Sequence, residues 1–246
     1  MLFYENNIIL YNVLTHRCHC AAVPPGGLER PGFFLFRRVS IMARVSFFVD
    51  GFNLYHALDN NRFRQFKWLN LRRLAELYLR KQDALSDIFY FTALVTWAPD
   101  KVQRHKHYIR VLESLGVKPI YGKFRKITKQ CRRCGQHYDT FEEKETDVNI
   151  AIELLEQARL NTYDRAVLLS GDSDQAPAVR TVKKNYPHKE VCALIPPCRT
   201  ANFLIKEANF HFKIRRQHLL SSRLPDEITL ADGAVIYCPE RWKDTV

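Results

Sequence analysis

Apolar and polar positions follow two alternating periods from residue 45 onward. Short runs that are apolar almost throughout predict β-strands, and these are residues 45–50, 87–96, 117–124, 165–170, 189–195 and 210–214. Apolar residues that recur every three or four positions predict helices from residue 54 and at 70–81, 99–115, 146–159, 173–186 and 200–208. Buried strands that alternate with helices are typical of a parallel sheet covered on both faces. The pattern therefore predicts an α/β domain whose parallel sheet is sandwiched by helices.

Three segments depart from this alternation. The organisation we expect is an unstructured leader at 1–41, one domain at 42–220 with a polar insertion at about 125–143, and an irregular C-terminal extension at 221–246. The leader shows neither period, and Met42 stands directly before the first strand, so we hypothesise that Met42 is the natural start. Within the extension, Asp232 and Gly233 predict the turn of a hairpin.

Composition limits the classes of protein. The 246 residues carry a formal net charge of +12, which suits a polyanionic partner but is also compatible with any basic protein. No run reaches the roughly 18 apolar residues of a membrane span, and residues 1–20 lack the early basic region of a secretory signal. The seven cysteines are odd in number and irregularly spaced, unlike a secreted disulfide framework. We therefore expect a cytoplasmic protein without membrane association.

Four acidic residues fall where the expected strands end or the expected helices begin. They are Asp50, Asp147, Asp172 and Asp174. Asn53 follows the first of them by three positions, and Gly51 between them allows a close approach of backbone or ligand. Because ligands bind at the carboxyl ends of parallel strands, and gathered carboxylates repel one another without a cation, these residues predict a metal site. Ligands that are all oxygen favour Mg²⁺ or Mn²⁺.

Each acid also has a purely structural interpretation. Asp50 and Asp172 stand where an N-cap would stabilise the next helix, and Gln175 could complete a capping box. Asp147 would lie in the first helical turn, where the helix dipole favours a negative charge. A cap needs one acid only, so the two acids that flank Ser173 favour the metal interpretation.

Three sequence blocks, in this order, resemble the NYN domain of the LabA-like group, whose members are relatives of PIN-domain nucleases. The blocks are residues 48–53, 144–148 and 170–174, and the resemblance covers about 44–215. It implies a PIN-like parallel α/β sandwich and divalent-metal-dependent cleavage of RNA, which we expect to be single-stranded. The family's acidic site maps onto Asp50, Asp147, Asp172 and Asp174, with Asn53 beside them. All four acids are present, so we expect an intact catalytic site with Mg²⁺ or Mn²⁺ as its cofactor.

Cys131 and Cys134, within the polar insertion, have the spacing of half a zinc knuckle. A structural zinc ion takes four protein ligands, so His137 would be a third candidate and the site would be completed elsewhere or across a homodimer. The alternative is a reduced, solvent-exposed loop. The basic residues around the two cysteines could instead contact RNA phosphates, as could further basic clusters at 72–73, 101–106, 183–184 and 213–216.

Two further function classes stay open. The same fold could serve as a non-catalytic RNA-binding or regulatory module, and metal-dependent cleavage that is lost in Asp50→Asn separates it from the nuclease. Ser173 could be an esterase nucleophile with His188, His211 or His218 as its base, although no Asp-x-x-His pair follows it. Ester hydrolysis that is insensitive to chelators and lost in Ser173→Ala would favour the esterase.

Overall fold

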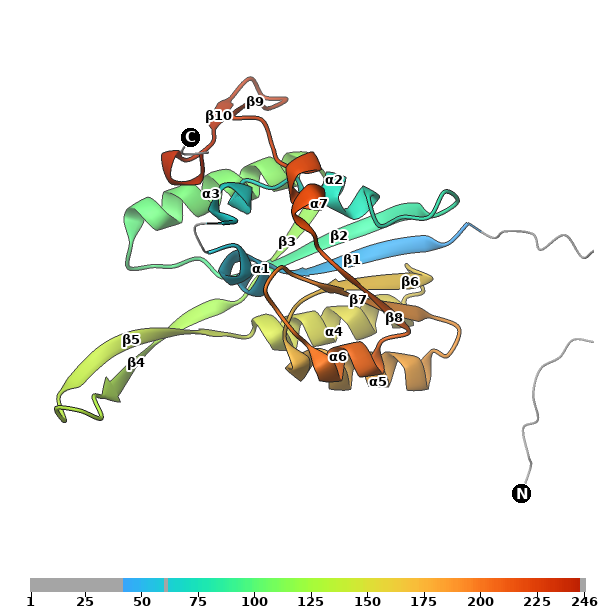
Figure 1. Ribbon diagram of the computed structural model, residues 1–246, viewed down its shortest axis with the longest axis horizontal. Coiled ribbons are helices and arrows are strands. Elements are labelled where there is room, and N and C mark those ends of the chain that lie inside the picture. Colours follow the sequence, from blue (N-terminus) through green and yellow to red (C-terminus); the bar gives the residue numbers. More distant parts are fainter. Residues whose placement is uncertain (1–41, 60–61, 244–246) are drawn as a thin grey trace, which may run out of the picture. The chain divides into compact units, whose positions relative to one another are not determined.

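A single parallel sheet organises the part of the chain that the structure describes, a computed structural model of residues 42–59 and 62–243. The expectations for the leader at 1–41 lie outside these residues. In spatial order, the sheet consists of β3 (Val117–Tyr121), β2 (Ala84–Thr92), β1 (Arg44–Asp50), β6 (Arg165–Leu169), β7 (Glu190–Ile195) and β8 (Phe210–Lys213) (Figure 1). Every neighbouring pair of these strands is parallel. The predicted parallel α/β fold is therefore confirmed.

Helices cover both faces of the sheet, as the alternating pattern predicts (Figure 1). One face carries α1 (Gly51–Leu58), α2 (Leu71–Glu76), α3 (Pro99–Ser114) and α7 (Arg216–Ser221). The other face carries α4 (Thr146–Arg159), α5 (Ala176–Asn185) and α6 (Asn202–Glu207). None of the helices within the described ranges is long and apolar enough to cross a membrane.

Two hydrophobic cores result from the period of two along the strands. Side chains of successive strand residues point to opposite faces, so Phe47 and Val49 of β1 enter the core beneath α1 and α3, whereas Phe48 enters the core beneath α4 and α5. Trp68 is fully buried in the first core and Leu154 in the second. Because the central strands β1, β6 and β7 are buried on both sides, their sequences read as nearly continuous apolar runs.

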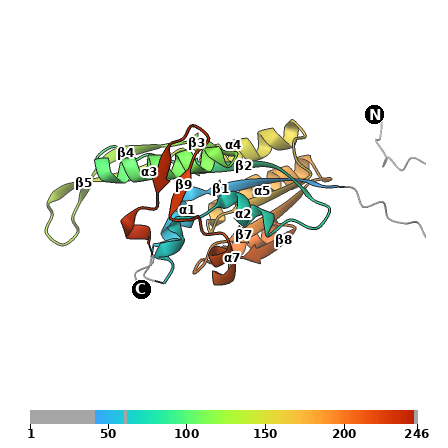
Figure 2. The same cartoon turned by 90° about the horizontal axis from the view of Figure 1, so that it is seen from above.

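The polar insertion forms a long antiparallel hairpin rather than a loop. Its strands are β4 (Lys123–Gln130) and β5 (His137–Lys144), and the hairpin projects beyond the parallel sheet in both views (Figures 1 and 2). Cross-strand ion pairs stabilise it, including Lys126–Asp139 at 2.6 Å and Lys129–Glu142 at 2.7 Å. The predicted strand at 117–124 is interrupted at Gly122, where a Cβ would lie 2.7 Å from the Lys144 carbonyl oxygen.

The C-terminal tail contributes to the first core. It contains the expected hairpin, β9 (Glu227–Thr229) and β10 (Val235–Tyr237), whose turn includes Gly233 at a φ of +81°. Ile236 and Trp242 are buried in the core beneath α1 and α3, so the tail is packed where an irregular extension was expected. Trp68 donates its indole N–H to the Pro225 carbonyl oxygen at 2.7 Å, which fixes the start of the tail.

Candidate metal centre

The central strands β1 and β6 bring the first and third sequence blocks together. The strand order of the sheet reverses between them, which is where open α/β sheets bind ligands. Val49 pairs with Leu169, so Asp50 and Ser170 leave the sheet side by side. The Ser170 hydroxyl donates a hydrogen bond of 2.8 Å to the Asp50 carboxylate. The first and third sequence blocks therefore lie next to each other at the carboxyl edge of the sheet.

Asp50 combines the two roles that its sequence position allows. Its carboxylate accepts a hydrogen bond of 2.9 Å from the Asn53 backbone N–H and so caps α1. The side chain is nevertheless buried, and this burial raises its pKa to about 6. The negative charges of Asp147 and Asp172 raise the pKa further, and the two hydrogen bonds lower it. Asp50 is therefore a cap whose ionisation is resisted by its surroundings.

Asn53 positions the loop that follows β6. Its side-chain oxygen accepts a hydrogen bond of 2.9 Å from the Gly171 backbone N–H. A Cβ at Gly171 would lie 2.8 Å from the Arg199 Cβ and 2.9 Å from the Asn53 oxygen, so only glycine fits this contact without a shift. The structure thus makes Asn53 a link between α1 and the Gly171 loop, and it places Arg199 against the same loop.

Asp172, Asp174 and Asp147 lie around that loop. The Asp172 carboxylate accepts a hydrogen bond of 2.9 Å from the Asp174 backbone N–H and caps the short helix η2 (Ser173–Gln175). The Asp147 carboxylate, in the first turn of α4, accepts a hydrogen bond of 3.0 Å from the Gln175 side-chain amide. Burial raises the pKa of Asp147, and the charges of Asp172 and Asp174 raise it further. All four predicted acids therefore share one neighbourhood at the carboxyl edge of the sheet.

Glu143, near the end of β5, is a fifth carboxyl group that the sequence analysis missed. Burial raises its pKa to about 7, a hydrogen bond from the Thr146 hydroxyl lowers it, and the charges of Asp50 and Asp147 raise it. Its position resembles that of Asp50, because both precede a helix at the end of a strand. That signal was hidden since residues 137–144 carry no apolar run that would identify a strand.

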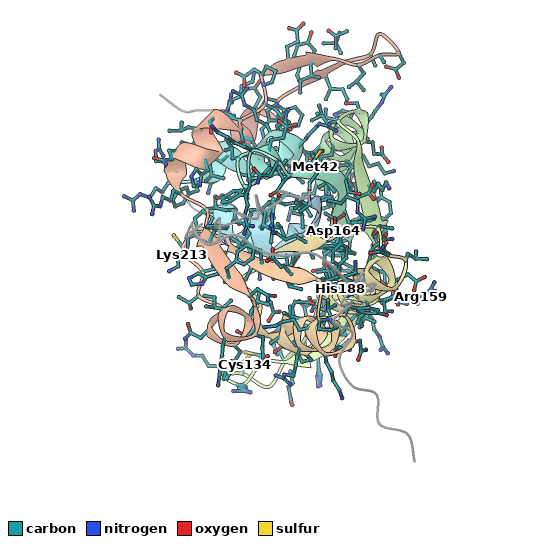
Figure 3. All side chains as sticks on the ribbon, turned by 90° about the vertical axis from the view of Figure 1, so that its right-hand side faces the viewer. Met42, Cys134, Arg159, Asp164, His188 and Lys213 are labelled. Atoms are coloured by element: carbon teal, nitrogen blue, oxygen red, sulfur yellow. The ribbon has the colours of Figure 1, made fainter. Side chains whose placement is uncertain are left out.

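The five carboxylates lack basic counterions. Throughout the described chain, no Lys, Arg or His forms an ion pair with Asp50, Glu143, Asp147, Asp172 or Asp174. The amino edge of the sheet, which faces the viewer in Figure 3, differs: Asp164 pairs with Arg44 at 2.8 Å. Asp164 is thus neutralised by arginine at the amino edge, whereas the five carboxylates at the carboxyl edge have no such partner among the described residues.

The chemistry of this cluster fits a hard divalent cation. Within residues 42–59 and 62–243, no three His, Cys, Asp or Glu side chains are already arranged around one metal position. The donors are nevertheless all carboxylates without a basic partner, and burial together with the negative charges of neighbouring acids raises the pKa values of Asp50, Glu143 and Asp147. Binding Mg²⁺ or Mn²⁺ would require the carboxylates to turn toward the ion.

Among the described residues, the hairpin offers two candidate zinc ligands, which are Cys131 and Cys134. Cys131 and Cys134 lie together at the exposed turn, where hydrogen bonds from the backbones of Cys134 and Arg133 and from the Cys134 thiol lower the pKa of Cys131. His137 does not join them, since no group of three such donors is found in the described parts of the chain. A structural zinc site with four protein ligands is therefore incomplete there.

Comparisons with known proteins agree with the order of the blocks. Residues 44–215 match the family model described as the NYN domain. The chain is 26% identical over 222 residues to the curated protein 6-hydroxy-3-succinoylpyridine 3-monooxygenase HspA of Pseudomonas putida, covering 74% of this chain and 68% of that protein. A crystal structure of a protein of unknown function from Vibrio parahaemolyticus aligns with a TM-score of 0.49 and 21% identity, covering 74% and 97% of the two chains. The family match spans more than half of the sequence, and this chain therefore belongs to the NYN domain family.

Proposed function

We propose that this chain is a ribonuclease that hydrolyses RNA phosphodiester bonds with Mg²⁺ or Mn²⁺ as its cofactor. The observation that carries the proposal is the group of five carboxylates without counterions at the point where the strand order reverses. NYN domains have a PIN-like, nuclease-type fold, and the chain's net charge of +12 suits a polyanionic substrate.

The carboxylates would have two roles, to bind the cation and to orient the attacking water. Asp50, Asp147 and Asp172 would be metal ligands, with Glu143 as a further oxygen donor, and Asp174 would orient the attacking water. A bound divalent ion supplies Lewis acidity, which activates a coordinated water and offsets the charge that develops on the phosphate. Asn53 and Ser170 act as positioning residues, because their hydrogen bonds hold Gly171 and Asp50 in place.

Arg199 lies against the Gly171 loop. Its Cβ packs against Gly171, and its residue is exposed. It has no ion-pair partner among the residues that the structure describes. We assign it to an RNA phosphate next to the cleaved bond. Lys213, at the carboxyl end of β8, lies on the same edge of the sheet and adds a second positive charge there.

The finer assignments made from sequence stay predictions. They are membership of the LabA-like group, single-stranded RNA as the substrate, a cytoplasmic location and a homodimer. A non-catalytic RNA-binding module on the same fold is the second candidate, because no three donors in the described residues already enclose a metal position.

The decisive assay is cleavage of single-stranded RNA by the purified full chain. We expect cleavage with Mg²⁺ or Mn²⁺, none with EDTA, and none with Asp50→Asn, which keeps an oxygen that can cap α1. Binding of RNA by both proteins without any cleavage at millimolar metal would instead identify the non-catalytic module.

A further inference from the structure

A cavity of about 310 Å³ opens beside the carboxylate cluster, on the face of the sheet that α1 and α3 cover. Several aromatic side chains line it, and they include Tyr55, Tyr90, Trp97, Tyr108, Phe124 and Trp242. Trp97 and Tyr55 are each about 40% exposed, so aromatic surface remains open to a ligand. Basic residues also line the cavity, namely Lys67, Lys101 and Arg104.

The cavity and the carboxylate cluster share a boundary at the end of β1. Gly51, which lines the cavity, directly follows Asp50. A Cβ at Gly51 would lie 2.5 Å from Cε2 of Tyr90, so the backbone next to Asp50 packs directly on this aromatic wall. Phe124 extends the wall toward the hairpin, where β5 carries Glu143. A ligand could therefore place a phosphate at the carboxylates and a flat ring in the cavity.

The polar groups of the cavity match an uncharged aromatic ring that carries hydrogen-bonding edges. Lys67 already has its charge balanced by Asp59, at 2.6 Å, and its Nζ lies 3.6 Å from the centre of the Tyr55 ring. His105 bonds to the Thr92 hydroxyl at 3.2 Å, and burial lowers its pKa to about 4, so it is neutral at pH 7. Lys67, His105 and Thr92 therefore offer hydrogen-bond donors and acceptors without an unbalanced charge.

Two of the basic residues of α3 add positive charge beside the aromatic wall. Lys101 and Arg104 lie on the helix that lines the cavity, and neither has an ion-pair partner among the described residues. Arg104 also approaches the Trp242 ring, with its guanidinium carbon 5.9 Å from the ring centre. Aromatic walls with adjacent cations are how proteins hold bases of single-stranded nucleic acid.

We propose that this cavity binds the base of the nucleotide that flanks the cleaved phosphate, and so gives the enzyme a preference at that position. This inference rests on the proposed ribonuclease function. The phosphate of the bound nucleotide lies at the carboxylate cluster, and its base stacks on the aromatic wall beside Gly51. Sequence preference then arises from the cavity, whereas the carboxylates act on any RNA backbone.

The test uses short single-stranded RNAs that each carry one abasic nucleotide, with the full chain and Mn²⁺. We expect one position beside the cut at which the missing base lowers kcat/KM about tenfold, the effect of losing one stacked base. Val95→Phe fills the cavity and should cleave intact and abasic RNA at equal rates. Val235→Phe, the same change at an exposed valine of β10, should keep the tenfold difference. Ala93→Leu fills the cavity by a smaller step and replaces Val95→Phe if that variant does not fold.

Each alternative result has a separate meaning. Equal cleavage of all abasic RNAs by the unmodified protein, or a preference that persists in both cavity-filling variants, overturns the cavity assignment and leaves the ribonuclease intact. Saturable binding of free indole that Val95→Phe abolishes, with no abasic effect, also overturns it, because the cavity then holds a small aromatic molecule. If no RNA is cleaved, the proposed function fails, and binding of intact against abasic RNA in EDTA still decides whether the cavity takes a base.

Discussion

Single carboxyl groups at the end of β1 and directly before η2 cap helices and also belong to the candidate site. Asp50 and Asp172 each accept a backbone N–H at the start of a helix, as their sequence positions indicate. Capping alone does not explain why Asp50 is buried, nor why Asp147 and Asp172 are near enough to raise its pKa. At the scale of the residue, both acids therefore act as helix caps, and the metal interpretation needs variants that keep the cap and remove the charge.

Substituting Asp172 by asparagine separates the cap from the charge most cleanly. We expect Asp172→Asn to abolish RNA cleavage, because a charged metal ligand is lost, while RNA binding is unchanged or slightly stronger, because one negative charge is removed. Asparagine also caps helices, so the melting temperature should hardly change. The matched control is Asp232→Asn, since Asp232 likewise accepts a hydrogen bond from the N–H two residues later, at 3.1 Å. Loss of folding with normal activity per folded molecule would show that Asp172 is only a cap.

The pKa of Asp50 predicts how stability depends on pH in metal-free protein. Burial raises this pKa from 3.8 to about 6, so the folded state binds more protons than the unfolded state between these values. The contribution of Asp50 to stability is therefore greatest below about pH 4, and it is lost as the pH rises to about 6. The difference between these two pKa values corresponds to about 3 kcal/mol of folding free energy. Urea unfolding in EDTA should show this fall, and Asp50→Asn should reduce it.

Glu143 should show the same sign over a higher range. Its pKa is raised to about 7. In the Asp50→Asn variant, the stability of the metal-free protein should therefore still fall as the pH rises toward 7. The control is Asp226→Asn, which alters an exposed acid that pairs with Arg223 at 2.7 Å. A pH profile of Asp50→Asn that matches the unmodified protein would mean that Asp50 ionises without penalty.

At the scale of the element, the junction between β1 and α1 allows one residue type only. A Cβ at Gly51 would lie 2.5 Å from the Tyr90 ring and 2.6 Å from the Phe91 carbonyl oxygen, and the latter cannot move without distorting β2. We expect Gly51→Ala to lower the free energy of unfolding by about 1–3 kcal/mol, which urea titration measures. Cleavage should fall as well, because Asp50 and Asn53 flank the displaced residue. Unchanged stability would show that the junction is looser than the contact distances indicate.

Elements with strong apolar periods were the ones that sequence predicted well. The central strands β1, β6 and β7 were expected because burial on both faces leaves a continuous apolar signature. Helix α4, at Thr146–Arg159, was expected because its apolar residues recur at helical spacing. The hairpin was missed because its strands are polar on both faces and are held by ion pairs across the ladder. Glu143 was missed for the same reason, since its burial comes from long-range packing beside Asp50. The acids at strand ends were found because each apolar run marks where a strand ends. The carboxyl ends of parallel strands meet at one edge of the sheet, where ligands bind.

On the scale of the whole molecule, parallel strands place basic and acidic groups on one edge. Lys213 ends β8, and Arg215 and Arg216 follow at the start of α7, on the carboxyl edge that also carries Asp50. Replacing all three by alanine should weaken RNA binding and lower the salt slope by about 2, since each phosphate contact on a single strand contributes about 0.7. Cleavage at saturating RNA should persist.

The control for that variant changes two lysines away from this edge. Lys81 precedes β2 and Lys184 lies in the last turn of α5, so both are near the amino ends of the strands. Substituting them by alanine should leave the salt slope almost unchanged. The same loss per removed charge in the two variants, measured by fluorescence anisotropy over a salt series, would mean that RNA binds through net charge alone and not through the carboxyl edge.

The most direct test of the metal centre is the anomalous scattering of Mn²⁺ in crystals of the protein. Our account predicts one or two peaks among Asp50, Asp147, Asp172 and Asp174, with carboxylate oxygens at about 2.0–2.6 Å from each ion. The same soak of Asp172→Asn crystals should weaken or remove a peak. Crystals at millimolar Mn²⁺ that show no peak among these four side chains, or a peak only elsewhere, would contradict the assignment of this carboxylate cluster as a metal centre.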